Sequence, residues 1–252
     1  MELTEYKQEG RTSKNRLINI ERLYKLFNKT PIPVDQLLVS LGLYMRSSAL
    51  TKVLFINELY QKILNIPGVI MEFGIWWGQN IVLFENLRAI YEPFNYDRRI
   101  IGFDTFSGYS EISDEDIKSD VIKEGGYTVS KDYDKYLKEL IDYHEQENVL
   151  YYGSKHKLIK GNVQNTIGEF LKKEPQIIIA LAYLDLALYE PTKKCLEEIR
   201  YHLIRGSIVV IDGLNSSDYP GETIALKETW GLKGYHIYKS KFMPGRSYIV
   251  ID

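Results

Sequence analysis

The chain has 252 residues, 44% of them hydrophobic, and a formal net charge of −2. This hydrophobic share argues against intrinsic disorder, and the small negative charge argues against a nucleic-acid partner, which a basic surface would attract. The polar N-terminus has no apolar signal segment, and the longest apolar run, residues 177–188, is shorter than the roughly 20 residues that span a bilayer. We therefore expect a cytoplasmic protein that binds neither membrane nor nucleic acid.

The first 66 residues predict helices. Apolar residues recur at helical spacing between residues 17 and 27, at 35–43 and at 48–66, where Pro67 and Gly68 end the third helix. We treat residues 1–66 as a helical extension or cap. It could cover a binding site, or it could form the interface of a homo-oligomer.

Residues 67–252 alternate between strands and helices. The apolar runs that predict strands are residues 69–73, 99–103, 157–159, 177–184, 207–211, 235–239 and 247–251. The segments that predict helices between them are residues 80–91, 166–173, 192–203 and 223–230. This alternation predicts an α/β fold with a mainly parallel, Rossmann-like sheet, helices on both faces and one antiparallel pair at the end. Cys195, the only cysteine, falls within a predicted helix and is expected to pack in the core.

One segment, residues 107–148, departs from this alternation of strands and helices. It is charged, contains a Gly125–Gly126–Tyr127 sequence, and predicts a helix only at 132–144. Because it follows the end of a strand, we expect a lid-like insertion over a ligand. A solvated excursion with one helix is the alternative.

The loop after the first strand runs from Glu72 to Asn80 and contains Gly74, Trp76 and Gly78. A dinucleotide site would need glycine where Trp76 stands, because the backbone must approach the pyrophosphate. The loop instead suits a ligand without phosphates, such as S-adenosylmethionine. Backbone N–H groups at the helix start would hold its carboxylate, and Glu72 would neutralise its ammonium or sulfonium charge. The two glycines would let the backbone approach the ligand, although a tight turn with no ligand is the alternative.

Three aspartates stand directly after predicted strands. Asp104 follows the second strand and could accept hydrogen bonds from both ribose hydroxyls of a nucleoside, or it could cap the next element. Asp185 and Asp212 follow two later strands, so their carboxylates should face one crevice. Without a nearby His or Cys, they suit a hard cation such as Mg²⁺, although helix caps or a hydrogen-bonded pair would explain them too.

These residues form motifs that resemble the macrocin O-methyltransferase-like family of class I methyltransferases, from about Ser48 to the C-terminus. The motifs are, in chain order, Glu72-x-Gly74-x-Trp76-x-Gly78, Gly102-x-Asp104-x-Phe106-x-Gly108, Lys160-Gly161-Asn162-x-x-x-Thr166, Leu184-Asp185-x-x-Leu188-Tyr189-Glu190-x-Thr192, Ile211-Asp212 and Tyr219-Pro220-Gly221. The resemblance implies a seven-stranded sheet with an antiparallel last strand. It also implies methyl transfer from S-adenosylmethionine to a hydroxyl of a sugar, a sugar nucleotide or a glycosylated small molecule.

The resemblance also implies roles for single residues. The expected cofactor-binding residues are Glu72, Gly74, Trp76, Gly78, Asp104, Gly161, Asn162 and Asp185. Asp185 and Asp212 are the expected catalytic residues and the ligands of a magnesium ion that the family holds with three aspartates. The chain departs from the family at Gly213 and Ala187, which stand where the family has acids. Asn215 or Asp218 could supply the missing oxygen, or no metal binds.

The family's general base, a histidine of the insertion, has no match near residues 125–129, and His144 is the nearest histidine. Two alternative functions remain open at this point. The departures at Gly213 and Ala187 favour a cofactor-binding partner protein that has lost catalysis. A nucleotide-sugar oxidoreductase is a further alternative, which Trp76 disfavours.

Overall fold

The computed structural model describes residues 14–117, 122–152 and 154–252 and divides the chain into two compact units, residues 1–51 and 52–252. The smaller unit holds helix α1 (Lys14–Asn28), helix α2 (Val34–Val39) and the 3₁₀ helix η1 (Leu41–Tyr44). The sequence predicted one helix over 35–43, but α2 ends at Val39, and a 3₁₀ turn that contains Gly42 follows. Glycine disfavours continuation of an α-helix, which explains the break.

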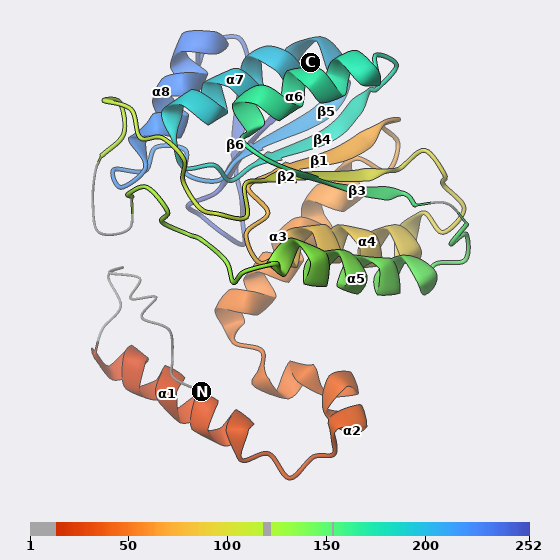
Figure 1. The fold of residues 1–252 in the computed structure, drawn as a ribbon. Helices are drawn as coiled ribbons and strands as arrows, with labels where there is room; N and C mark the ends of the chain where they lie inside the picture. The colour runs from red at the N-terminus through yellow and green to blue at the C-terminus, as the bar shows by residue number, and fades with distance from the viewer. Residues whose placement is uncertain (1–13, 118–121, 153) are drawn as a thin grey trace. The chain divides into compact units, whose positions relative to one another are not determined.

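The larger unit is built on one seven-stranded sheet (Figure 1). Its strands are β1 (Val69–Phe73), β2 (Ile100–Asp104), β3 (His156–Lys160), β4 (Ile179–Leu184), β5 (Leu203–Ile211), β6 (His236–Lys239) and β7 (Ser247–Val250). They lie in the order β3-β2-β1-β4-β5-β7-β6. The first five strands in this order are parallel, and β7 is antiparallel to both of its neighbours, β5 and β6. The predicted mainly parallel sheet with an antiparallel end is confirmed.

Helices cover both faces of this sheet. α6 (Val163–Lys173), α7 (Tyr189–Ile199) and α8 (Pro220–Thr229) lie on one face, and α3 (Ser47–Lys62), α4 (Gln79–Tyr91) and α5 (Tyr133–Gln146) lie on the other (Figure 1). Every residue of β1 and β4 is consequently buried, which is why these strands are apolar runs rather than alternating ones. Cys195 of α7 is fully buried in this core, as expected.

Both boundaries of α7 differ from the sequence prediction, and a distant residue sets the first of them. The helix predicted over 192–203 is α7, which begins at Tyr189, where the carboxylate of Asp116 accepts the backbone N–H of Tyr189 at 2.9 Å. This contact satisfies a helix N-terminal donor from outside the helix. At its other end, the 3₁₀ helix η2 (Arg200–His202) leads straight into β5, so Leu203 is a strand residue. No described helix is long and apolar enough to cross a membrane.

Candidate active site

The loops that follow β1, β2, β4 and β5 carry backbone strain. Trp76, Phe106, Ala187 and Asn215 each have a positive φ of 51–62° in these loops. A left-handed backbone costs a residue with a side chain about 1–2 kcal/mol, and such strain concentrates at functional sites. The strain therefore marks the carboxyl edge of the sheet, which lies on the left of Figure 1, as the candidate site.

Gly74 and Gly78 frame the loop between β1 and α4. Gly74 has a φ of +87°, and a Cβ built there would lie 2.1 Å from the backbone oxygen of Asp185. Gly78 has a φ of +80°, and its Cβ would lie 2.4 Å from a methyl carbon of Leu137 on α5. We expected glycines here so that a ligand could approach, but protein atoms fill the space that a side chain would need.

Glu72 lies within β1, directly before this loop, and is 1% exposed. Its Oε2 atom and the Oδ1 atom of Asn80 are buried without a hydrogen-bond partner among the described residues. Burial raises the pKa of the Glu72 carboxyl to about 8, against the opposing effects of Lys52 and Asn80, while Asp185 and Asp104 raise it further. A buried carboxylate with one oxygen left without a partner is suited to receive a cationic ligand group.

Asp104 ends β2 and joins two loops. Its Oδ2 atom accepts the backbone N–H of Trp76 at 2.8 Å, and its Oδ1 atom accepts the backbone N–H of Phe106 at 2.6 Å. Burial raises the pKa of Asp104, although these backbone donors oppose the shift. The backbone N–H groups of Ile75 and Thr105 also point to this carboxylate, which thus lies at the centre of the loops after β1 and β2.

Gly161 and Asn162 follow β3 next to Asp104. The backbone N–H of Gly161 donates to the carbonyl of Asp104 at 2.9 Å. Asn162 caps α6, because its side-chain oxygen accepts the N–H of Gln164 at 3.0 Å, and its amide nitrogen donates to Ser110 of the insertion at 3.2 Å. Much of the Asn162 side chain is thus already engaged within the protein.

Asp185 and Asp212 follow neighbouring strands in matching register, since Leu184 pairs with Ile211. Asp212 is 6% exposed. Its carboxylate accepts a hydrogen bond from the hydroxyl of Tyr183 at 2.8 Å and lies 2.5 Å from the Nε atom of Arg246. Burial, and then the negative charge of Asp212, raise the pKa of Asp185 well above its ordinary value, with Lys52 opposing. The expected convergence of the two acids is confirmed.

Two residues of this crevice escaped the sequence analysis. Glu222, in the first turn of α8 and 1% exposed, accepts three backbone N–H groups: those of Leu186 at 3.0 Å, Ala187 at 2.9 Å and Gly213 at 2.6 Å. Burial and the charge of Asp212 raise the pKa of Glu222 to about 7. Arg246 comes from the turn between β6 and β7. Glu222 directly follows the Tyr219-Pro220-Gly221 motif, and this position could have identified it as a site residue. No sequence pattern marks Arg246 as a site residue.

Tyrosines of the insertion cover the crevice. The hydroxyl of Tyr127 lies 3.0 Å from that of Tyr219, and its ring packs against the rings of Trp76 and Tyr109 at centroid distances of 5.6 and 5.4 Å. Asp116 reaches the start of α7, as described above. The described part of the insertion thus contacts the cofactor loop and the loops after β4 and β5. Its other half, α5, packs against α4 and β3.

The carboxylates of the crevice are poorly suited to bind a divalent metal ion. Asp212 is already paired with Arg246 and Tyr183, and Glu222 is occupied by three backbone donors. Asn215 and Asp218 are exposed. Mg²⁺ requires free carboxylates or substrate phosphates, and the crevice offers Asp185 as its one carboxylate not engaged in this way.

His144 does not lie at the crevice. It is on α5, three turns beyond Tyr133, whose hydroxyl reaches the carbonyl of Trp77, and it lies beside Asn86 of α4. Eleven residues of helix separate His144 from Tyr133 by about 16 Å. The candidate base suggested by the resemblance is therefore not positioned to act there.

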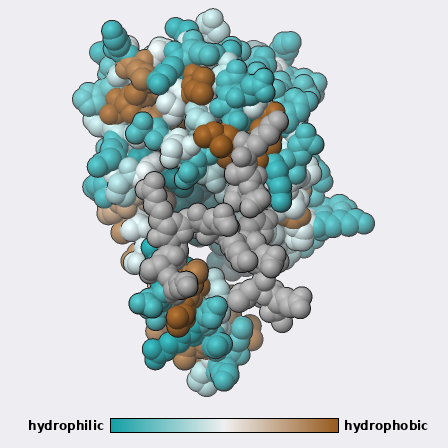
Figure 2. All heavy atoms as spheres, turned by 90° about the vertical axis from the view of Figure 1, so that its left-hand side faces the viewer, coloured by the Kyte–Doolittle hydropathy of each residue, from teal (hydrophilic) through white to brown (hydrophobic). Residues whose placement is uncertain are grey.

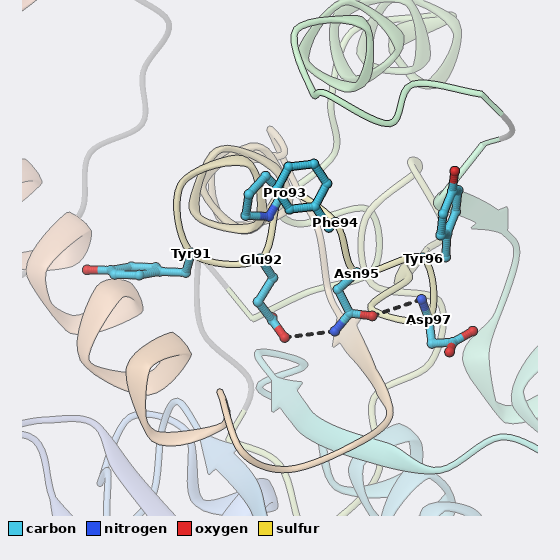
Figure 3. A pocket seen from close by; sticks show the side chains of 7 residues that line it. All are labelled: Tyr91, Glu92, Pro93, Phe94, Asn95, Tyr96 and Asp97. Atoms are coloured by element: carbon cyan, nitrogen blue, oxygen red, sulfur yellow. Dashed lines mark hydrogen bonds between the residues drawn. The ribbon is translucent and has the colours of Figure 1, made fainter.

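Two other features of the described residues are less suited to bind a ligand. Glu85, Glu145 and His156 are buried and close enough to hold a metal ion, but Arg88 and Lys155 already pair with these carboxylates. A shallow hollow of about 530 Å³ is formed by residues 91–97 at the opposite edge of the sheet (Figure 3). Its polar groups bond one another, because Asn95 donates to Glu92 at 2.8 Å and accepts the N–H of Asp97 at 3.0 Å.

Comparison with known proteins decides the family. The model of the macrocin O-methyltransferase (TylF) family matches residues 53–225. The chain belongs to the macrocin O-methyltransferase family. It is accordingly an S-adenosylmethionine-dependent O-methyltransferase, and the oxidoreductase alternative is wrong.

Solved structures agree with this membership. A crystal structure of the calicheamicin methyltransferase CalS11 is 39% identical, with a TM-score of 0.92, 94% of this chain covered and 93% of that chain covered. A second CalS11 structure, of the apo TDP-rhamnose 3′-O-methyltransferase, is 38% identical, with a TM-score of 0.84 and coverages of 94% and 95%. The O-methyltransferase NovP, 17% identical with a TM-score of 0.59 over 80% of this chain and 79% of that chain, shares the fold. No curated protein sequence matches the chain.

Proposed function

We propose that this enzyme transfers a methyl group from S-adenosylmethionine to a sugar hydroxyl of a nucleotide-linked deoxysugar. The observation that carries the proposal is the 38% identity, over 94% of this chain, to CalS11, which acts on TDP-rhamnose. The crevice supports a polar acceptor, because tyrosine hydroxyls and carboxylates gather there beside the cofactor loop. On the face seen in Figure 2, hydrophobic residues form separate patches among hydrophilic ones.

The loop after β1 and the end of β2 fit the cofactor. We infer that the ionised Glu72 carboxylate receives the ammonium group, since its Oε2 atom is buried and unpaired. Asp104 would accept the ribose hydroxyls, and backbone groups between Gly74 and Gly78 would hold the methionyl carboxylate. The rest of the cofactor site would be formed by Trp76, Gly161, Asn162 and Asp185.

When bound, S-adenosylmethionine supplies a methyl group already activated by the sulfonium charge. The protein's remaining tasks are to orient the acceptor hydroxyl in line with that methyl group and to accept its proton. Asp185 is our candidate for the proton acceptor, because it lies directly beside Gly74 and stands at the crevice. Asp212, held by Tyr183 and Arg246, would orient the acceptor.

The remaining expectations from the sequence stay predictions. We propose that the insertion over residues 107–148 closes over bound ligands through its Tyr127 side. Of the predicted extension over residues 1–66, α3 packs on the sheet, and we propose that the residues before 52 serve as a cap or in a homo-oligomer. No described residue between 15 and 51 is buried, although many are large and hydrophobic, which favours an oligomer. The cytoplasmic location likewise stays a prediction.

The acceptor is tested with purified enzyme, methyl-labelled S-adenosylmethionine and TDP-rhamnose, with the product analysed by mass spectrometry and NMR. We expect a singly methylated nucleotide sugar. Unmodified rhamnose supplied without its nucleotide is the matched control and should react far more slowly. Absence of methylated product with TDP-rhamnose and with other nucleotide-linked deoxysugars would contradict the proposed acceptor class.

A further inference from the structure

Arg246 places a fixed positive charge among the acids of the crevice. Its Nε atom lies 2.5 Å from the Oδ1 atom of Asp212. The turn that carries it is held by two backbone bonds, from the N–H of Arg246 to Met243 at 2.8 Å and from the N–H of Ser240 to the carbonyl of Arg246 at 2.9 Å. The guanidinium is therefore delivered to Asp212 by a structured hairpin and not by a free surface side chain.

The charge of Arg246 acts on the whole crevice. The guanidinium interacts electrostatically with Asp212 and also with Asp185, Tyr183 and Glu222. Tyr127 and Tyr219 line the same crevice. Arg246 consequently occupies, in electrostatic terms, the place that a metal ion would take between the acids.

Glu222 closes the position at which a further metal-binding carboxylate would stand. A Cβ on Gly213 would lie 2.8 Å from the Oε2 atom at the end of the Glu222 side chain, so an acidic side chain at 213 would require Glu222 to shift from its present place. Glu222 is also bound to the N–H groups of both acidic loops, at Ala187 and Gly213. Gly213 and Ala187, the two positions that depart from the family motif, are thus both held by hydrogen bonds to Glu222.

We infer that Arg246 replaces the divalent metal ion of this enzyme, so that the charge of Asp212 is compensated by a guanidinium and the enzyme needs no metal. The inference rests on the proposed function of the crevice as the acceptor site. Arg246 is a positioning residue that acts through Asp212. It acts by placing a positive charge 2.5 Å from the carboxylate of Asp212.

Metal binding is the direct test, read by the electron paramagnetic resonance of Mn²⁺ added to the intact enzyme with S-adenosylhomocysteine. We expect the wild type to show no saturable Mn²⁺ binding at millimolar ion and to keep its methyl transfer to TDP-rhamnose in EDTA. In Arg246→Gln, Mn²⁺ should bind at least about tenfold more tightly, because a competing cation is gone and Asp212 is released. Lys241→Gln, which removes an exposed charge from the same hairpin, should leave Mn²⁺ binding as in the wild type.

A second arm separates the role of the positive charge from simple structural loss. Arg246→Lys keeps the charge, so it should recover part of the turnover that Arg246→Gln loses while still excluding Mn²⁺. Saturable Mn²⁺ binding by the wild type that disappears in Asp185→Asn and Asp212→Asn would overturn the inference. So would activity that EDTA abolishes and Mg²⁺ restores. The Mn²⁺ titration needs no acceptor, so it gives its answer even where the proposed acceptor class fails.

Discussion

The carboxylate of Asp104 holds the backbone N–H of Trp76 at 2.8 Å, across the gap between the loops after β2 and β1. Asp104 thus fixes the cofactor loop in addition to facing the ribose position. A substitution at Asp104 should therefore affect both loop geometry and ribose binding, whereas the sequence suggested either ribose binding or a cap of the next element.

For Asp104→Ala, we expect S-adenosylhomocysteine binding to weaken by at least tenfold, because each charged hydrogen bond lost costs about 1.5–3 kcal/mol. Isothermal titration calorimetry measures the affinity. Asp97→Ala removes an exposed carboxylate at the opposite edge of the sheet and should bind normally. Equal affinities in a folded Asp104→Ala protein and the wild type would remove the ribose assignment.

Trp76→Gly tests whether strain is retained for ligand binding. The substitution relieves a left-handed residue of φ 51°, about 1–2 kcal/mol, but adds backbone entropy of about 0.5–1 kcal/mol and loses the ring contact with Tyr127, so the melting temperature should fall less than in Trp77→Gly. Binding of S-adenosylhomocysteine should weaken because the indole is lost from the loop. Trp77→Gly is the matched control, since Trp77 has no such strain and packs against Tyr133 at 4.8 Å, and it should lower the melting temperature.

A clear fall in the melting temperature of Trp76→Gly, with ligand affinity unchanged, would show that Trp76 serves packing alone.

Glu72 gives the enzyme a pH dependence of cofactor binding. Its pKa of about 8 in the empty site means that it is mostly protonated at pH 7, and a cationic ammonium favours the ionised form. Affinity for S-adenosylhomocysteine should therefore rise with pH, by up to about tenfold per unit, and level off above about pH 8. Calorimetry between pH 6 and 8.5 should show this rise in the wild type and a flat profile in Glu72→Gln.

The same carboxyl affects stability in the opposite sense. Because its folded pKa is raised from 4.5 to about 8, its contribution to stability is present below pH 4.5 and is lost as pH rises through about 8. Glu72→Gln should thus gain melting temperature relative to the wild type at pH 9 but not at pH 5. Glu169→Gln, at an exposed position of α6, should follow the wild type at both. A wild-type affinity independent of pH would contradict the assignment of Glu72.

Gly74→Ala should destabilise the fold far more than Gly125→Ala. Both glycines have a positive φ, so each alanine brings about 1–2 kcal/mol of strain. A Cβ at Gly125 meets nothing within 4 Å, whereas one at Gly74 meets the backbone of Asp185 at 2.1 Å. Urea denaturation measures the difference, and equal destabilisation would show that the loop after β1 can yield.

The smaller unit provides a test of oligomeric state. Light scattering at tens of micromolar protein should give a multiple of 29.4 kDa, because Leu38 and Val39 are 67% and 84% exposed and need a partner surface. Leu38→Glu with Val39→Glu should lower the mass, while Tyr201→Glu in the larger unit should not. A wild-type monomer would contradict this expectation.

The sequence predicted the sheet and its acids well, for a physical reason. Strands buried on both faces are long apolar runs, and a polar residue that ends such a run, such as Asp104 or Asp185, must lie at the carboxyl edge. Glu222 and Arg246 were missed because α8 and the last hairpin bring them to the crevice from positions with no such run before them. The true reason for Gly74 was missed too, since only the packing of the loop after β4 against it shows why a side chain is excluded.

The left-handed residues at the sheet edge also set a limit on engineering. At Trp76, Phe106, Ala187 and Asn215, glycine would be tolerated by the backbone better than the residue present. A library of variants selected for heat resistance alone would enrich substitutions that remove the backbone strain of these loops, and active variants would be lost. Selection for a more durable enzyme must therefore demand turnover at every round, with its stabilising substitutions sought in the helices and not at this edge.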